Sequence, residues 1–246
     1  MERLILFGAG GHAKVVLDAL LRSGRDVVGL IDDDPAATGR LVLGLPVLGT
    51  RAVLTEEWAG AAIVPALGVN AARTALLDWL RDAPHPLASA IHPHAVIGAG
   101  AELGGGSFLA AGAVVNPDTQ LGEGAIVNTG ASVDHDCRIG RAVHIAPGAR
   151  LCGGVTVGDE TLVGTGAVII PGIRVGARDH PGVLARITAL VAEAGANIDE
   201  VHHQRAFSSL SAQSVEVELV LQTRNPGHVA EVVQRLQGAG FEAAVY

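Results

Sequence analysis

The sequence of 246 residues predicts three successive parts: an α/β unit, a parallel β-helix and an α+β unit. Three observations support this prediction. The first segment has the pattern of a strand, a glycine-rich turn and a helix, the middle segment has an aliphatic side chain at every sixth position, and the last combines helical segments with a two-residue alternation. We place the boundaries at residues 1–86, 87–176 and 177–246.

Composition and charge argue against several classes of protein. With 49% hydrophobic residues the chain can bury sizeable cores, and no stretch approaches the roughly 20 apolar residues that span a bilayer. The net charge is −8 without a basic stripe, and aromatic residues make up 3%, which argues against nucleic acid and anionic membranes as partners. Only Cys137 and Cys152 occur, without metal or redox spacing. We therefore expect a reduced, cytoplasmic protein with no signal peptide and no membrane insertion.

The first segment has the pattern of a Rossmann-like nucleotide-binding unit. A buried strand over residues 3–8 leads through the turn Gly8-Ala9-Gly10-Gly11-His12 into a helix, and a second strand over 26–31 ends at Asp32 and Asp33. A third strand over 61–67 is followed by a turn and a helix over about 72–82. Backbone N–H groups at the helix start can receive anionic groups, and carboxylates at a strand tip can meet a ribose or base. The strict dinucleotide pattern needs a glycine where Lys14 stands, which argues against a nicotinamide site.

The middle segment carries the six-residue period of a hexapeptide β-helix. This period fits neither a helix of 3.6 residues per turn nor a simple strand alternation. The aliphatic residues of the period are Ile91, Ile97, Leu103, Leu109, Val115, Leu121, Val127, Val133, Ile139, Ile145, Leu151, Val157, Val163, Ile169 and Val175.

Two other columns of this six-residue frame agree with stacked coils. The residue after the aliphatic is often glycine, as at Gly98, Gly104, Gly122 and Gly140, and we interpret this column as a repeated corner with positive φ. The residue two positions before the aliphatic is small or β-branched, which lets neighbouring coils approach closely.

Four motifs together give a resemblance to a known family. They are Gly8-Ala9-Gly10-Gly11-His12, Ile31-Asp32-Asp33, Gly68-Val69-Asn70 and Asn128-Thr129-Gly130-Ala131-Ser132-Val133-Asp134-His135-Asp136-Cys137. From residue 3 to about 176 the chain resembles the sugar acyltransferases that include sialic acid O-acetyltransferases and N-acetyltransferases of nucleotide-linked amino sugars. Members pair a Rossmann-like sugar domain with a trimeric left-handed β-helix that binds acetyl-CoA between subunits. The resemblance implies acetyl transfer from acetyl-CoA to an amino or hydroxyl group of a nucleotide-linked sugar.

The resemblance also assigns site residues. His135 matches the catalytic base and Asp136 the acidic residue that raises its basicity, at a position where the family often has Glu. The unperturbed pKa of imidazole lies near neutrality, which suits a base. Acetyl-CoA contacts are expected at His144, Gly153 and Thr165, and substrate contacts at Gly10, Gly11, His12, Asp32, Asp33 and Gly68. From the residues alone, the acidic cluster around His135 also fits a solvated corner, His144 a surface residue and the glycines ordinary turns.

A zinc site is the alternative for the histidines of the β-helix. Carbonic anhydrases of the γ class use the same architecture with a closely spaced histidine pair and a third histidine. Here the histidines are His92, His94, His135 and His144, with no such closely spaced pair near His135. We therefore expect no metal.

The last segment resembles the ACT domain appended to threonine dehydratases, over residues 179–207. Such domains are ferredoxin-like βαββαβ units that pair and often bind an amino acid. The resemblance implies an amino-acid effector near Asp179, Gly182 and Asn197, although Gly182 could simply make a turn and Asn197 cap a helix end. Two-fold pairing of these tails combined with a three-fold β-helix predicts a homotrimer that assembles into a dimer of trimers.

Residues 172–178 fit two folds at once. They supply the last hexapeptide frame and also the only candidate for the first ACT strand. The family usually continues with a further coil and a tail that hold CoA. If the segment joins the ACT sheet, the donor site is incomplete, and the alternative function is a non-catalytic amino-acid-binding regulatory scaffold with a degenerate transferase core.

Overall fold

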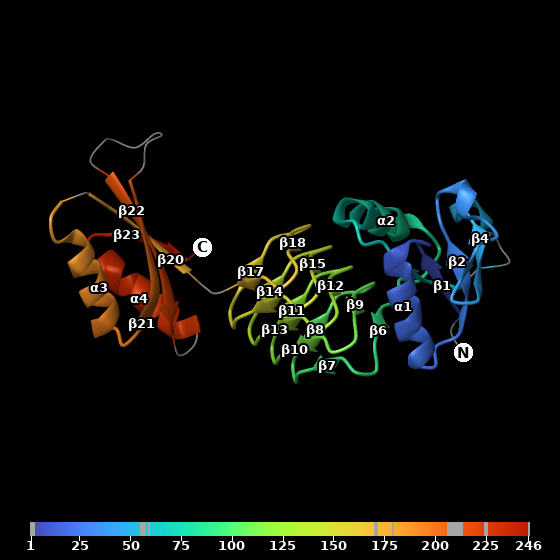
Figure 1. Cartoon of the computed structure of the whole chain (residues 1–246), viewed down its shortest axis with the longest axis horizontal. Coiled ribbons are helices and arrows are strands. Elements are labelled where there is room, and N and C mark those ends of the chain that lie inside the picture. The colour runs from blue at the N-terminus through green and yellow to red at the C-terminus, as the bar shows by residue number, and fades with distance from the viewer. Residues whose placement is uncertain are drawn as a thin grey trace. The chain divides into compact units, whose positions relative to one another are not determined.

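The computed structural model describes residues 3–54, 58, 60–169, 172–178, 180–205, 214–223 and 226–245 (Figure 1). The chain divides into two compact units, residues 1–168 and 169–246. No helix of the described residues is long and apolar enough to cross a membrane.

The N-terminal part is a five-stranded sheet in the order β3-β4-β2-β1-β5. Strands β1 (Leu4–Phe7), β2 (Val27–Ile31), β4 (Leu45–Gly49) and β5 (Ala62–Pro65) run parallel, and β3 (Leu41–Val42) pairs antiparallel with β4. Helices α1 (Gly11–Arg22) and α2 (Asn70–Asp82) and the short 3₁₀ turns Pro35–Ala37 and Arg51–Val53 complete it. Alternate residues of β1 belong to two different buried clusters, so both faces of the sheet are covered.

The β-helix consists of two-residue parallel strands on three sheets. Val115 pairs with Val133, and Val133 with Leu151, so one coil takes 18 residues (133 − 115). The second residue of each strand from Leu109 to Val163 is buried, whereas Ile97 near the start of the β-helix is exposed. The predicted six-residue period is confirmed through Ile169. The three sheets have the orders β19-β16-β13-β10-β7, β17-β14-β11-β8 and β18-β15-β12-β9-β6. The strands are β6 (Ala90–Ile91), β7 (Val96–Ile97), β8 (Glu102–Leu103), β9 (Phe108–Leu109), β10 (Val114–Val115), β11 (Gln120–Leu121), β12 (Ile126–Val127), β13 (Ser132–Val133), β14 (Arg138–Ile139), β15 (His144–Ile145), β16 (Arg150–Leu151), β17 (Thr156–Val157), β18 (Leu162–Val163) and β19 (Val168–Ile169).

The prediction that Val175 is the last aliphatic position of the β-helix is wrong. Strand β20 (Gly172–Arg178) pairs antiparallel with β22 and β23 in the second unit. Ile173 and Val175 are buried in the core of that unit while Arg174 between them is exposed. The two-residue alternation of a half-buried strand therefore prevails over the six-residue frame.

The interpretation of the glycine column is also wrong. From Ile97 to Val163 the left-handed backbone lies three residues after the aliphatic, as at Gly124 (φ 66°) and Asp136 (φ 59°). In the predicted column, Gly104, Gly122 and Gly140 are outside the left-handed region, but an added Cβ would lie 2.4 to 2.6 Å from a backbone nitrogen of the next coil. Glycine is required there because the coils stack closely.

The second unit has the predicted order βαββαβ. Its sheet has the order β21-β22-β20-β23, with β21 (Asn197–Arg205), β22 (Ser214–Gln222) and β23 (Glu242–Val245) all antiparallel to their neighbours. Helices α3 (Val183–Glu193) and α4 (Pro226–Gly238) pack into one core with the sheet. Its buried members include Ile173, Val175, Ile187, Val191, Val217, Leu219, Val232 and Leu236.

Candidate active site

His135 lies at the corner that follows β13. Its side chain is 46% exposed, and its Nδ1 is 2.7 Å from Oδ2 of Asp136. A carboxylate can only accept, so Nδ1 carries the proton and Nε2 of the neutral ring is left as the basic atom. The hydrogen bond to Asp136 raises the pKa of His135 above its ordinary value. An imidazole held in this way can act as a general base.

The preceding coil fixes this corner. Oδ1 of Asp134 accepts hydrogen bonds from Nδ2 of Asn116 at 2.8 Å and from the backbone N–H of His135 at 2.9 Å. The hydroxyl of Thr119 donates to the carbonyl oxygen of Asp134 at 2.6 Å. Asn116 was not among the predicted site residues, although its spacing of one coil from Asp134 (134 − 116 = 18) could have revealed it.

Gly153 lies one coil beyond His135 and makes room for the imidazole. A Cβ at Gly153 would be 2.5 Å from Cε1 and 2.6 Å from Nε2 of His135. Thr165, also predicted to contact acetyl-CoA, is exposed in the turn after β18.

His144 lies in a second cluster, with His12 of the glycine-rich turn. Their ring centroids are 6.1 Å apart, Nδ2 of Asn128 is 3.0 Å from Nε2 of His144, and His12 packs edge-on against Phe108. Nε2 of His12 is buried without a hydrogen-bond partner among the described residues. Burial, the neighbouring His144 and the cation of Arg73 lower the pKa of His12 to about 4. Burial and Arg73 also lower the pKa of His144, so both rings are neutral at pH 7.

Of the other predicted substrate residues, Gly68 joins this cluster. A Cβ on Gly68 would lie 3.5 Å from Cβ of His12. Gly10 is the N-cap of α1 and Gly11 its first residue, and both are exposed.

Asp32 and Asp33 have separate partners. Asp32 accepts from the backbone N–H groups of Ala9 at 2.7 Å and Asp34 at 3.0 Å, so it braces the glycine-rich turn. Asp33 accepts from Nε of Arg51 at 3.0 Å, and this bond lowers the pKa of the Asp33 carboxyl. Arg51 was not predicted, and its guanidinium also lies over the ring of Trp79 at 4.7 Å.

Within the described ranges, no group of three or more His, Cys, Asp or Glu side chains could hold a metal ion. The rings of His92 and His94 are neighbours, with centroids 5.2 Å apart.

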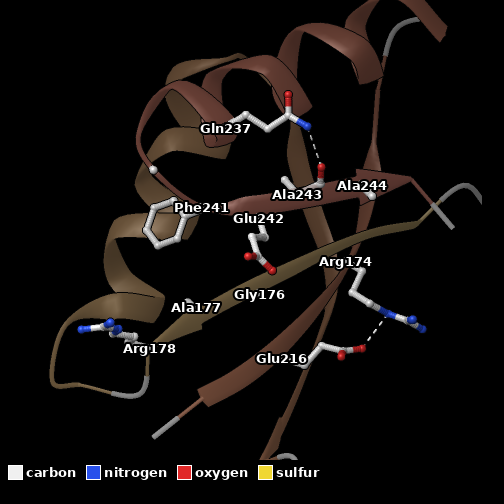
Figure 2. Close-up of a pocket in the computed structure, with 11 residues that line it drawn as sticks. Arg174, Gly176, Ala177, Arg178, Glu216, Gln237, Phe241, Glu242, Ala243 and Ala244 are labelled. Atoms are coloured by element: carbon white, nitrogen blue, oxygen red, sulfur yellow. Dashed lines mark hydrogen bonds and ion pairs between the residues drawn. The ribbon is translucent and has the colours of Figure 1, made fainter. Parts of the chain in front are cut away.

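The effector residues predicted in the second unit are partly described. Asp179 lies outside the described residues. Gly182 has φ 90° at the N-cap of α3, and Asn197 begins β21 and lines a shallow hollow of about 450 Å³ with Thr188 and alanines of α3. A larger hollow of about 900 Å³ lies over β20 and β23 (Figure 2) and contains none of the three. Figure 2 shows Arg174 paired with Glu216 at its edge.

Comparison with known proteins shows that the two parts of the chain are similar to two different families. Residues 3–80 match the PglD N-terminal domain. A histidine-to-asparagine variant of perosamine N-acetyltransferase from Caulobacter crescentus, solved with CoA and GDP-perosamine, is 38% identical with a TM-score of 0.62, and the match covers 69% of this chain and 89% of that one. The chain belongs to the sugar acyltransferase family. The acetyltransferase domain of PglB from Neisseria gonorrhoeae, solved with acetyl coenzyme A, is 37% identical with a TM-score of 0.62, over 68% of this chain and 81% of that one.

The C-terminal part of the chain is similar to a different family. Residues 172–238 match the ACT domain. L-threonine ammonia-lyase from Geobacter sulfurreducens is 44% identical over 63 residues, which are 26% of this chain and 16% of the lyase. The lyase from Thermotoga maritima is 34% identical over 67 residues, and the chain thus spans about a sixth of the length of these relatives. The predicted composite of an acyltransferase and an ACT domain is confirmed.

Proposed function

We propose that the protein transfers the acetyl group of acetyl-CoA to an amino or hydroxyl group of a nucleotide-linked sugar. The observation that carries the proposal is the pairing of His135 with Asp136 at 2.7 Å on an exposed corner of the β-helix, beside the space left by Gly153. Solved relatives that bind CoA together with GDP-perosamine, or acetyl coenzyme A, support both substrate classes.

His135 acts as the general base in this proposal. Nε2 takes the proton from the acceptor nitrogen or oxygen as that atom attacks the thioester carbonyl carbon. The carboxylate of Asp136 stabilises the imidazolium that forms, because it already accepts from Nδ1. When the tetrahedral intermediate collapses, the C–S bond breaks and the imidazolium returns its proton to the departing thiolate.

The N-terminal part binds the sugar nucleotide in this proposal, as a Rossmann-like domain. The backbone N–H groups at the start of α1, at Gly11 and His12, suit a phosphate. The neutral His12 keeps a donor and an acceptor, and its buried Nε2 has no hydrogen-bond partner among the described residues. Asp32 and Asp33 can still accept from substrate hydroxyls while they hold the turn and Arg51.

The donor site in this proposal comprises His144, Gly153 and Thr165 on a left-handed β-helix. A neighbouring subunit completes it in a trimer. The exposure of Val96 (56%) and Val168 (60%), both on the sheet that also carries Ser132 beside the His135 corner, supports such a packing surface.

The position of β20 supports a second candidate, the non-catalytic amino-acid-binding scaffold. Because β20 belongs to the ACT sheet, the β-helix ends at β19, and fewer coils remain to hold CoA. Family membership favours the enzyme, and binding of acetyl-CoA measured by calorimetry separates the two candidates.

Acetyl-CoA consumption, screened against a panel of nucleotide-linked amino sugars, tests the proposed function. We expect turnover with at least one sugar, and light scattering of the same sample should give a mass of three or six chains. If acetyl-CoA does not bind and no sugar is turned over, the scaffold function replaces the enzyme.

The ACT domain is proposed to bind an amino acid near Asp179, Gly182 and Asn197. Binding should release heat in calorimetry and raise the melting temperature with ligand concentration for at least one of isoleucine, valine, threonine and serine. Asn197→Ala should weaken the effect, because the side-chain amide is one of the proposed contacts. A tail that shows neither heat nor a melting shift with any of the four would be a structural appendage.

A further inference from the structure

Arg73 of α2 is the most deeply buried charged side chain among the described residues, at 1% exposure. Its Nε donates to the carbonyl oxygen of Gly124 at 2.7 Å and its Nη1 to that of Leu67 at 2.8 Å. Its Nη2 donates to Oδ1 of Asn70 at 2.9 Å and to the carbonyl oxygen of Ala142 at 2.7 Å. None of these hydrogen-bond partners is a carboxylate, and the Glu160 carboxylate acts on the buried charge only through the electrostatic field. Burial lowers the pKa of Arg73 to about 10, which leaves it charged at pH 7.

The bonded carbonyls form a ladder up one corner of the β-helix. Gly124, Ala142 and Glu160 follow one another at intervals of one coil, and each has a left-handed backbone with φ of 66°, 52° and 58°. Arg73 bonds the first two, and Nδ2 of Asn70 donates to the carbonyl oxygen of Glu160 at 2.7 Å. Figure 1 shows α2 beside β12 and β15, the strands that follow Gly124 and Ala142. Two side chains of α2 therefore engage three successive coils.

The same guanidinium holds the turn over residues 67–70. It bonds the carbonyl of Leu67 at one end of that turn and the side chain of Asn70 at the other. Gly68, between them, lies against His12. One side chain thus connects the predicted substrate turn to the β-helix that carries His144.

Docking of α2 on the β-helix has other sources of stability. Arg141 forms ion pairs with Asp78 at 2.8 Å and Glu123 at 2.9 Å, and Leu77 packs against Gly124 closely enough that a Cβ there would lie 2.5 Å from it. Burying a cation without a hydrogen-bonded carboxylate is costly, and an apolar residue would serve docking as well. The guanidinium is therefore suited to a task that requires several donors in a fixed geometry.

We propose that Arg73 is a positioning residue for the acceptor substrate: by bonding both the turn over residues 67–70 and the carbonyl ladder, it fixes the location of Gly68 and His12 relative to His144 and the β-helix. The proposal rests on the proposed function for the identity of the substrate. It assigns Arg73 no contact with the reacting atoms.

The variant Arg73→Met tests this role, with Arg81→Met as the matched control. Arg81 lies on the same helix, is 64% exposed and pairs with Asp78 at 3.5 Å. We expect Arg73→Met to raise the KM for the sugar acceptor about tenfold or more while the KM for acetyl-CoA stays within about twofold, because a displaced substrate loop affects only the acceptor. Arg81→Met should change neither value.

Titration of His12 by NMR gives a readout that does not depend on turnover. In the wild type the pKa of His12 is about 4, and Arg73 is one of its causes together with burial and His144. Removing the cation in Arg73→Met should raise that pKa. Arg73→Lys keeps the charge but not the fork of donors, so it should raise the acceptor KM while leaving the His12 titration low.

These measurements distinguish failure of the proposed role of Arg73 from failure of the proposed enzymatic function. A folded Arg73→Met protein with an unchanged acceptor KM and an unchanged His12 titration would overturn the proposal, and so would equal increases in both KM values. If Arg73→Met does not fold, Arg73→Lys and Asn70→Ala carry the same test. If the wild type acetylates no sugar, the proposed function fails by itself, and the His12 titration still decides whether Arg73 organises the His12 and His144 pair.

Discussion

Alanine at position 135 is expected to lower kcat for acetyl transfer by about 100-fold or more, because general-base catalysis contributes at least that much. The folded state should be nearly unaffected, since the ring is 46% exposed and, among the described residues, forms a hydrogen bond only with its neighbour in sequence. Steady-state kinetics with saturating acetyl-CoA, alongside a thermal melt, measures both effects. Near-wild-type turnover in His135→Ala would remove His135 from the mechanism.

The pH profile extends this test to Asp136. The hydrogen bond from His135 to Asp136 raises the pKa of His135, and a base must be unprotonated, so activity should be lost as the pH falls through that raised value. In Asp136→Asn the pKa of His135 falls, and the acid limb should move to lower pH while kcat decreases. Asp118→Asn is the matched control, because Asp118 occupies the same corner position one coil earlier with the same φ of 59°.

Gly122→Ala is expected to destabilise the β-helix strongly. The new Cβ would lie 2.6 Å from both the backbone nitrogen of Arg141 and the carbonyl carbon of Gly140, and backbone atoms cannot rotate away. The cost should be about 3 kcal/mol, seen as a fall in melting temperature of roughly 5–10 °C.

Gly164→Ala provides the control for this effect. Gly164 occupies the same column of the hexapeptide frame, but no described atom lies within 4 Å of its added Cβ. Gly164→Ala should therefore melt like the wild type. Equal melting of Gly122→Ala and the wild type would show that the coils yield to a methyl group.

The sequence predicted the β-helix through Ile169 because each coil repeats the same local pattern. It was wrong at Val175, where a two-residue and a six-residue period coincide over Ile173 and Val175 and only the tertiary partners decide between them. The prediction that glycines directly after the aliphatic residues have positive φ was wrong for a related reason. Glycine is needed both for positive φ and for close approach, and the true left-handed column also contains Asp118, Ala142 and Glu160.

The candidate site was predictable where its members are neighbours in sequence or one coil apart, as for His135, Asp136 and Gly153. The approach of His12 to His144 depends on the packing of the N-terminal sheet unit on the β-helix, which no local pattern encodes. Arg73 has the sequence pattern of an ordinary charge on an amphipathic helix, and only the docked structure shows it to be buried.

At position 136 the left-handed backbone favours glycine for stability, whereas the proposed catalysis needs the carboxylate of aspartate. Glycine occupies most of the equivalent corners, including Gly100, Gly112 and Gly154, and an aspartate in this conformation costs about 1 kcal/mol relative to it. Selection for thermal stability alone would therefore favour glycine at position 136 and remove the carboxylate that orients His135. Selection for turnover would keep the aspartate. The residue found at position 136 in a population of variants should therefore indicate whether the population was selected for stability or for activity.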